Sequence, residues 1–338
     1  MNRRDFFQSL PPPAAGPPSP GEVALLRVGR RAMATHFEIL LPYGQPAALD
    51  AAQDALDLID RLEDQLTVFR EKSEVCRLNR LAPLGWVPVE RGLFELLQTA
   101  CRLHQETDGA FDVTAGPLIK AWGFYRRQGR VPGEEELREA LARVGMRHVR
   151  LDPARSAVRY DRPGVEVNFG AIGKGYALDR VKELLGGEWG VRCGLVHGGS
   201  SSVLSLGVPP DDPRGWEVAV KHPWEPGRTL AVVRLRGGAL GTSAATYQHF
   251  EYNKRRLGHI LDPRTGRPAE GVASATVLAP TAAEADALST AFYTLGVPAA
   301  RAYCERRADV AAVLLPEGAD RPVALNLGPA DCAAPAAV

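Results

Sequence analysis

One glycine-rich stretch in the middle of the chain constrains the fold more than any other feature. Apolar residues alternate through residues 165–169, and three glycines follow within six residues, at Gly170, Gly173 and Gly175. Beyond them, apolar residues recur at helical spacing from Ala177 onward. Alternation is typical of a strand, clustered glycines of a tight turn, and the later spacing of a helix. The stretch therefore predicts a strand, a glycine turn and a helix in succession.

Such a turn has the chemistry of a phosphate site. It presents free backbone amides at the positive end of a helix, and glycines without Cβ atoms let a phosphate approach closely. The spacing Gly170-x-x-Gly173-Lys174-Gly175 differs from both the nucleotide P-loop and the dinucleotide-binding motif. Two interpretations stay open: a cradle for a diphosphate, or a turn that only packs a helix on a sheet.

Length and charge narrow the class of protein. The 338 residues can bury a substantial core as one large or two ordinary domains. Lysine and arginine number 41 against 40 acidic residues, without a long basic run, so a nucleic-acid surface is not expected. No apolar run has the length of a membrane-spanning helix. The five cysteines form no Cys-x-x-Cys pair and are expected to be buried or incidental thiols.

The first 22 residues differ in composition from the rest. They are rich in proline and are expected to be disordered or extended. Arg3 and Arg4 followed by Phe6 and Phe7 are typical of a twin-arginine export signal, but prolines stand where its apolar segment belongs. This degenerate signal leaves the compartment open between the periplasm and the cytoplasm. The folded domain is expected over residues 23–330.

The remaining pattern predicts an α+β domain. An amphipathic helix is expected at residues 47–66, a second helix at 91–107 and a charged surface helix at 134–144. Strands are expected at residues 22–28, 37–41, 148–151, 157–160, 216–221, 229–234, 239–242, 257–261 and 274–278. Because most of these strands follow one another through short turns, we expect a largely antiparallel sheet core covered by helices.

A helix near the C-terminus carries a possible set of metal ligands. Residues 281–284 have capping-box spacing, and Gly296 would end the helix. Asp286 and Thr290 share one face with Tyr293, opposite an apolar face, so truncating Asp286 is expected to cost little core packing. A carboxylate and a hydroxyl one turn apart suit Mg2+, which takes hard oxygen ligands. The alternative is a polar helix face without a ligand.

The segment His259-Ile-Leu-Asp262-Pro-Arg264-Thr-Gly266 combines a histidine with a turn. On an extended strand, side chains three residues apart point to opposite faces. We therefore expect His259 to face a ligand, and Asp262 and Arg264 to fix the turn. An unperturbed histidine titrates near neutral pH, which suits proton transfer.

Five stretches, taken together, resemble the ApbE family of FAD:protein FMN transferases. They occur in the family's order over roughly residues 30 to 300. They are residues 33–37 (MATHF), 107–118 (TDGAFDVTAGPL), 168–179 (NFGAIGKGYALD), 259–266 (HILDPRTG) and 285–290 (ADALST).

The resemblance implies a set of site residues. Residues expected to bind FAD are Met33, Phe69, Ala110, Phe111, Asp112, Asn168, Gly170, Lys174, His259 and Ile260. His259 and Lys174 would also be catalytic, and Mg2+ would be held by Asp286, Thr290 and the carbonyl of Ala171. Two alternatives stay open from the residues alone: Met33 as an ordinary core methionine, and Asp112 as a capping residue.

The implied reaction is the Mg2+-dependent transfer of FMN from FAD to a threonine hydroxyl, with release of AMP. The implied acceptor is a flavoprotein subunit of the Rnf or Nqr type, or another protein with an FMN-binding domain. The alternatives are an FAD diphosphatase that gives FMN and AMP, and a protein that binds FAD without chemistry.

The chain departs from the family pattern at two places. Asn168 replaces the usual Asp, and residues 243–246 (SAAT) replace Ser-Gly-Asp-Tyr. Because a threonine held in a strand cannot easily reach in-line geometry, we expect transfer to a separate protein and not to Thr246.

Overall fold

The computed structural model describes residues 23–126, 128–245, 249–252, 255–328 and 330–333. The predictions for residues 1–22 and for Thr246 lie outside the described residues.

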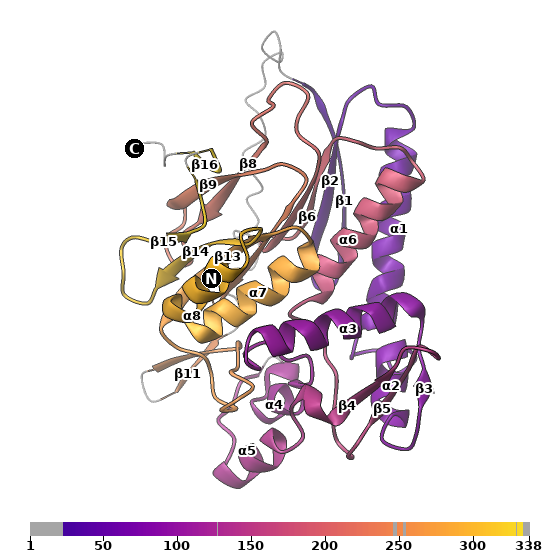
Figure 1. The fold of residues 1–338 in the computed structure, drawn as a ribbon, viewed down its shortest axis with the longest axis vertical. Helices are drawn as coiled ribbons and strands as arrows, with labels where there is room; N and C mark the ends of the chain where they lie inside the picture. Colours follow the sequence, from indigo (N-terminus) through magenta and orange to yellow (C-terminus); the bar gives the residue numbers. More distant parts are fainter. Residues whose placement is uncertain (1–22, 127, 246–248, 253–254, 329, 334–338) are drawn as a thin grey trace.

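An eight-stranded sheet forms the centre of the molecule (Figure 1). Each neighbouring pair of its strands is antiparallel, which confirms the predicted sheet type. In spatial order the strands are β1 (Leu25–Ala32), β2 (Thr35–Pro42), β6 (Gly194–Gly198), β7 (Ser202–Leu206), β10 (Ala239–Ala244), β13 (Val272–Ala279), β14 (Ala311–Pro316) and β15 (Val323–Leu325).

Helices cover one face of this sheet, as Figure 1 shows. They are α1 (Ala48–Leu66), α6 (Gly173–Gly187), α7 (Ala282–Leu295) and α8 (Val297–Arg306). The amphipathic pattern predicted for α1 is confirmed, because its residues at helical spacing, such as Ala55, Ile59 and Leu62, are buried. On the sheet, Ile39 and Leu41 of β2 belong to the same core cluster.

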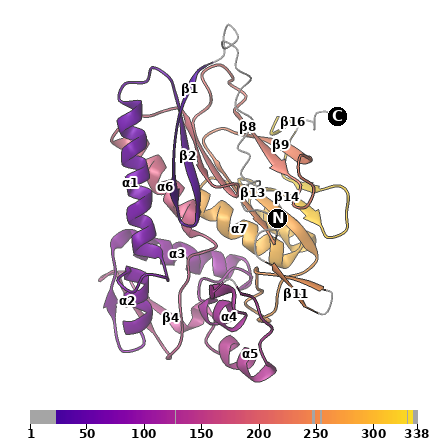
Figure 2. The ribbon, with the colours of Figure 1, turned by 180° about the vertical axis from the view of Figure 1, so that it is seen from behind.

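A second, three-stranded sheet lies against the other face. It consists of β8 (Trp216–Lys221), β9 (Thr229–Leu235) and β16 (Cys332–Ala333), in the order β16-β9-β8, and is best seen from behind (Figure 2). Leu40, which alternates with Ile39 and Leu41 along β2, packs in a separate cluster with Trp216 and Val233. The alternation of a strand thus supplies side chains to two cores.

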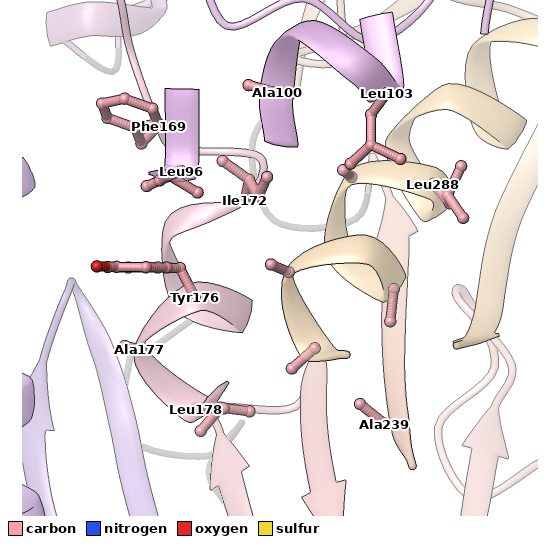
Figure 3. Packing of buried hydrophobic residues seen from close by; sticks show 14 of the residues in the cluster. Leu96, Ala100, Leu103, Phe169, Ile172, Tyr176, Ala177, Leu178, Ala239 and Leu288 are labelled. Carbon is pink, nitrogen blue, oxygen red and sulfur yellow. The ribbon is translucent and has the colours of Figure 1, made fainter. Parts of the chain in front are cut away.

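The remaining elements lie below the main sheet in Figure 1. They comprise α2 (Glu74–Leu81), α3 (Arg91–Glu106), α4 (Gly116–Ala121), α5 (Glu134–Leu141), two short 3-10 helices (Phe124–Arg126 and Met146–His148), a sheet of β3 (Val87–Pro88), β5 (Ala157–Tyr160) and β4 (Val149–Asp152), and the hairpin of β11 (His249–Tyr252) and β12 (Arg255–Gly258). Leu96, Ala100 and Leu103 of α3 lie in the core beside Ile172 and Leu288, which joins α3 to the turn before α6 and to α7 (Figure 3).

Two predictions about local structure are wrong. Residues 165–169 do not form a strand of a sheet: among them Glu166 alone makes a bridge, to Ala115. The alternating residues Val165, Val167 and Phe169 are buried, so their pattern reports burial rather than a neighbouring strand. The backbone amide and carbonyl of Val167 instead bond to the side chain of Asn79, at 2.8 and 2.9 Å.

The second wrong prediction is the polar face of α7. The helix itself is confirmed, since Thr281 accepts a hydrogen bond from the amide of Glu284 and Gly296 ends the helix. However, Asp286 and Tyr293 are each only 5% exposed. Because α7 packs between the main sheet, α6 and α3, it is buried around most of its circumference.

Within the described residues, no helix combines the length and apolarity needed to cross a membrane. All five cysteines are free, and Cys304 is the buried one.

Candidate active site

The glycine turn opens α6 and brings that helix against α7. The amides of Ile172 and Gly173 bond to the carbonyl of Phe169, which closes the turn. A Cβ atom on Gly175 would lie 2.0 Å from the carbonyl oxygen of Ala282 in α7. Only glycine permits this approach, so the packing interpretation holds for Gly175.

Asp286 lies at this contact, with its carboxylate buried. One oxygen, Oδ2, accepts a hydrogen bond from the amide of Gly175 at 2.8 Å, and the other, Oδ1, accepts one from Ser202 Oγ at 2.7 Å. The ammonium group of Lys174 lies 4.0 Å from Oδ2. Burial raises the pKa of Asp286, against the effects of Lys174, Ser202 and Gly175. The predicted residues Lys174 and Asp286 are therefore neighbours.

Hydroxyl groups extend this cluster along α7. Thr290 Oγ1 lies 3.3 Å from the backbone carbonyl of Asp286 and 3.1 Å from Ser243 Oγ, which in turn lies 2.8 Å from Ser289 Oγ. Strand β10 lies very close to α7 at Gly241, where a Cβ atom would be 2.4 Å from the carbonyl carbon of Ala285. Glycine at this position permits the approach. The cluster thus combines one carboxylate with several hydroxyl oxygens.

Sequence reasoning did not identify Ser202 and Ser243 of this cluster, or Asp179, which binds the first turn of α7. Ser202 follows Gly198 and Gly199, and Ser243 begins the segment in which the chain departs from the family pattern. Asp179 ends the motif at residues 168–179, and its carboxylate accepts the amides of Ala282 and Ala283, each at 2.8 Å. Burial raises the pKa of Asp179 to about 6, while these amides act to lower it. Asp179 lies about one helical turn after Gly175, and this spacing in the sequence could have indicated it.

Met33 lies in the turn of the β1–β2 hairpin. Its φ of 47° and that of Ala34, 61°, are left-handed, and the amide of Met33 donates to Glu63 Oε2 at 2.8 Å. A Cβ atom on Gly199 would lie 2.1 Å from Thr35 Oγ1, so this hairpin packs against the backbone at Gly199. Met33 is half-buried and packs on the main core, as a core methionine would.

The loop at residues 108–112 follows α3. Ala110 and Phe111 are 1% exposed, and the carboxylate of Asp112 is engaged within the protein. Its Oδ1 accepts hydrogen bonds from the amide and the hydroxyl of Thr114, at 2.7 and 2.6 Å, and its Oδ2 lies 3.2 Å from His104 Nδ1. Asp112 does not cap a helix, since the N-cap residue of α4 is Ala115. Its contact with a flavin stays a prediction.

A cavity of about 250 Å3 lies beside Asn168. It is lined by Val68, Cys76, Asn79, Arg80, Gly116, Lys120, Tyr125, Glu166, Val167 and Asn168. Phe69, 66% exposed, stacks on Tyr125 with ring centroids 4.8 Å apart. The amide of Asn168 bonds to the carbonyl of Val113 at 2.7 Å, and Asn168 Oδ1 accepts the amide of Gly170 at 2.8 Å. The structure thus places Asn168 at this cavity, and Phe69 against Tyr125, another residue of its lining.

The turn after His259 has the predicted structure. Asp262 accepts hydrogen bonds from the amide and the guanidinium of Arg264, at 2.8 to 2.9 Å. Arg264 Cγ lies near Gly109, so this turn rests on the loop at residues 108–112. The half-buried His259 ring lies edge-on to Phe124, 6.4 Å between centroids, and Ile260 is buried.

A cation at this site would bind one carboxylate together with hydroxyl and carbonyl oxygen atoms. In the part of the chain that the structure describes, no three His, Cys, Asp or Glu side chains group as metal ligands do. Asp286, the hydroxyls of Thr290 and Ser243, and the backbone carbonyl of Ala171 in the glycine turn are the candidate donors.

Comparison with known proteins gives consistent matches. The ApbE family model matches residues 33–314. The FAD:protein FMN transferase of Escherichia coli K12 is 31% identical over 275 residues, 79% of this chain and 76% of the relative. A protein of the same name from Klebsiella pneumoniae strain 342 is 33% identical over 301 residues, 87% and 91% of the two chains.

Solved structures agree with these sequence matches. The ApbE protein of Thermotoga maritima MSB8 superposes with a TM-score of 0.81 at 30% identity, covering 89% of this chain and 97% of that one. The flavin transferase ApbE of Vibrio cholerae gives a TM-score of 0.77 at 26% identity, covering 90% and 98%.

Proposed function

The chain belongs to the ApbE family, and from this premise we propose that it transfers FMN from FAD to a threonine hydroxyl of an acceptor flavoprotein, with Mg2+ as cofactor and AMP as product. Relatives that share about a third of its residues over most of its length are FAD:protein FMN transferases. The observation that carries the proposal is the hydrogen bond between the glycine turn and the buried carboxylate of Asp286. This bond brings the glycine turn, Lys174 and an acid to one point.

The residues of the cluster fit a magnesium ion. Mg2+ prefers hard oxygen donors and keeps few protein ligands. Asp286 is a buried carboxylate whose nearest cation, Lys174, lies at 4.0 Å, so a divalent cation would hold it ionised. Asp286, Thr290 and the carbonyl of Ala171 would hold the ion, which would neutralise negative charge on the diphosphate of FAD.

The protein's own groups supply the rest of the site. Lys174, on the first turn of α6, would bind the diphosphate. The amides of Gly170, Ile172, Gly173 and Gly175 already bond within the protein. Phe69 offers an exposed ring face for the isoalloxazine or the adenine ring. His259 would accept the proton of the attacking hydroxyl.

The proposed step is a displacement at phosphorus. The threonine oxygen forms a bond to the FMN-side phosphorus, and the bond from that phosphorus to the bridging oxygen breaks. AMP leaves with the bridging oxygen and its electron pair, and the hydroxyl proton passes to His259. The threonine then carries FMN as a phosphoester.

A mass measurement tests this proposal. Purified protein is incubated with FAD, Mg2+ and a threonine-bearing fragment of a flavoprotein, and both proteins are weighed intact. The proposal expects the fragment to gain one FMN as AMP appears in equal amount. Free FMN and AMP without a heavier fragment would identify a diphosphatase, and saturable FAD binding without products a binding protein.

A further inference from the structure

His104, on the last turn of α3, lies under the loop that the family resemblance assigns to the flavin. The amide of Gly109 donates to the backbone carbonyl of His104 at 2.9 Å, and a Cβ atom on Gly109 would lie 3.4 Å from the ring carbon Cε1. On the same ring, Nδ1 lies 3.2 Å from the carbonyl oxygen of Phe111 and 3.2 Å from Oδ2 of Asp112. The loop therefore closes around the imidazole.

The two neighbours of Nδ1 determine its protonation. A backbone carbonyl and a carboxylate are both acceptors, so Nδ1 must carry a hydrogen to bond to either. The Nδ1–H group of His104 is thus shared between the backbone carbonyl of Phe111 and the carboxylate of Asp112. Burial lowers the pKa of His104, but the hydrogen bond and charge of Asp112 outweigh it and raise the pKa.

Asp112 links His104 to a second loop through hydrogen bonds to Thr114. Its other oxygen is bound by Thr114, whose hydroxyl oxygen also accepts the amide of Gly145 at 2.6 Å. The residue between them, Val113, accepts the amide of Asn168 at 2.7 Å. Fixing Asp112 therefore also fixes the backbone beside Asn168, at the edge of the cavity.

We propose that His104 is a positioning residue for flavin binding: by bonding to Phe111 and Asp112 it sets the distance between the loop at residues 108–112 and the segment at Asn168. This inference rests on the proposed function, because it takes FAD as the ligand. It adds a residue that lies outside the motifs that carry the family resemblance.

The fold has a separate means of ending α3, so loss of His104 should not unfold the protein. Thr107 Oγ1 donates to the carbonyl of Leu103 at 2.7 Å and accepts the amide of Phe111 at 3.3 Å. The side chain of His104 is 23% exposed, whereas that of Asp112 is 1% exposed. Removing the imidazole should therefore loosen residues 109–113 while α3 persists.

The test compares two variants with a control. His104→Leu fills the space without a donor, and His104→Asn keeps an N–H group near the position of Nδ1. Gln105→Leu, an exposed position on the same turn, controls for a new leucine. FAD binding is titrated by flavin fluorescence, amide hydrogen exchange is followed over residues 109–113, and KM and kcat are measured for transfer.

We expect His104→Leu to weaken FAD binding about tenfold, as the loss of one charge-assisted hydrogen bond would. KM for FAD should rise in step, with kcat within about twofold of wild type, and exchange at residues 109–113 should quicken. His104→Asn and Gln105→Leu should stay within about twofold of wild type in affinity.

Three results would overturn the proposal: wild-type affinity in His104→Leu, an equal loss in His104→Asn, or unchanged exchange over residues 109–113. If His104→Leu does not fold, His104→Asn decides, since a tenfold loss in that variant also overturns it. If wild type itself binds no FAD, the proposed function fails, and unchanged loop exchange in His104→Leu then overturns the positioning role separately.

Discussion

At the scale of single residues, the site depends on Asp286, whose two carboxylate oxygens bond to different elements. Removing the carboxylate leaves the amide of Gly175 and the hydroxyl of Ser202 without their acceptor. The expectation that truncation costs little packing assumed an exposed face, and the observed burial overturns it. A buried donor without a partner costs about 1–3 kcal/mol.

We therefore predict that Asp286→Ala both abolishes Mg2+-dependent turnover of FAD and lowers the free energy of unfolding by about 2 kcal/mol or more. Urea unfolding and a turnover assay measure the two effects. Asp54→Ala, at an exposed position of α1, should change neither. Full activity in Asp286→Ala would show that Asp286 takes no part in the reaction.

A second prediction at this scale concerns pH. Because the pKa of His104 is raised in the folded protein, its pairing with Asp112 stabilises the fold fully below the unfolded value of 6.5. This contribution is lost as pH rises through the higher folded pKa. The difference in free energy of unfolding between wild type and His104→Asn should thus shrink as the pH rises above about 6.5. A difference independent of pH would mean that His104 is neutral throughout.

At the scale of elements, the contact between α6 and α7 holds the two halves of the site together. Gly175→Ala should destabilise the protein by about 2 kcal/mol or more, since its Cβ atom would meet the carbonyl of Ala282 at 2.0 Å. Gly187→Ala, on the same helix with nothing within 4 Å of its Cβ, should stabilise by up to about 1 kcal/mol. Thermal unfolding of both variants checks the pair, and equal behaviour would contradict the close packing.

Elements whose pattern had one buried and one exposed face were predictable from sequence. The helix predicted at residues 47–66 is α1, and the strand at residues 157–160 is β5 with the same ends. Residues 165–169 were misread because alternation records which side chains are buried and not what the backbone bonds to. The burial of α7 was missed because the apolar residues that surround it lie far away in sequence.

Site residues that lie within short sequence motifs could be predicted, whereas those that depend on contacts between distant positions could not. Lys174, Asp286 and Thr290 were identified from short motifs, and the structure places them around one cluster. Ser202 could not be identified, because its role arises from a hydrogen bond across 84 positions of sequence. Asp112 shows the reverse case, since a carboxylate in a motif proves to be bonded within its own loop.

At the scale of the whole molecule, a ligand that binds only the folded chain must stabilise all of it. FAD at 100 times its dissociation constant should raise the free energy of unfolding by about 2.7 kcal/mol. We predict that Mg2+ enlarges this gain in wild type and not in Asp286→Ala. Urea unfolding with FAD, with and without Mg2+, measures it. An equal effect of Mg2+ in both proteins would place the ion elsewhere.

The hydrogen bond from Gly175 to Asp286 joins residues 111 positions apart. During synthesis the glycine turn therefore leaves the ribosome long before its acidic partner exists. Contacts of such separation form late, because the intervening chain must first be ordered. A chain interrupted before α7 would contain the glycine turn but not the carboxylate of Asp286, and so would lack the proposed cation site.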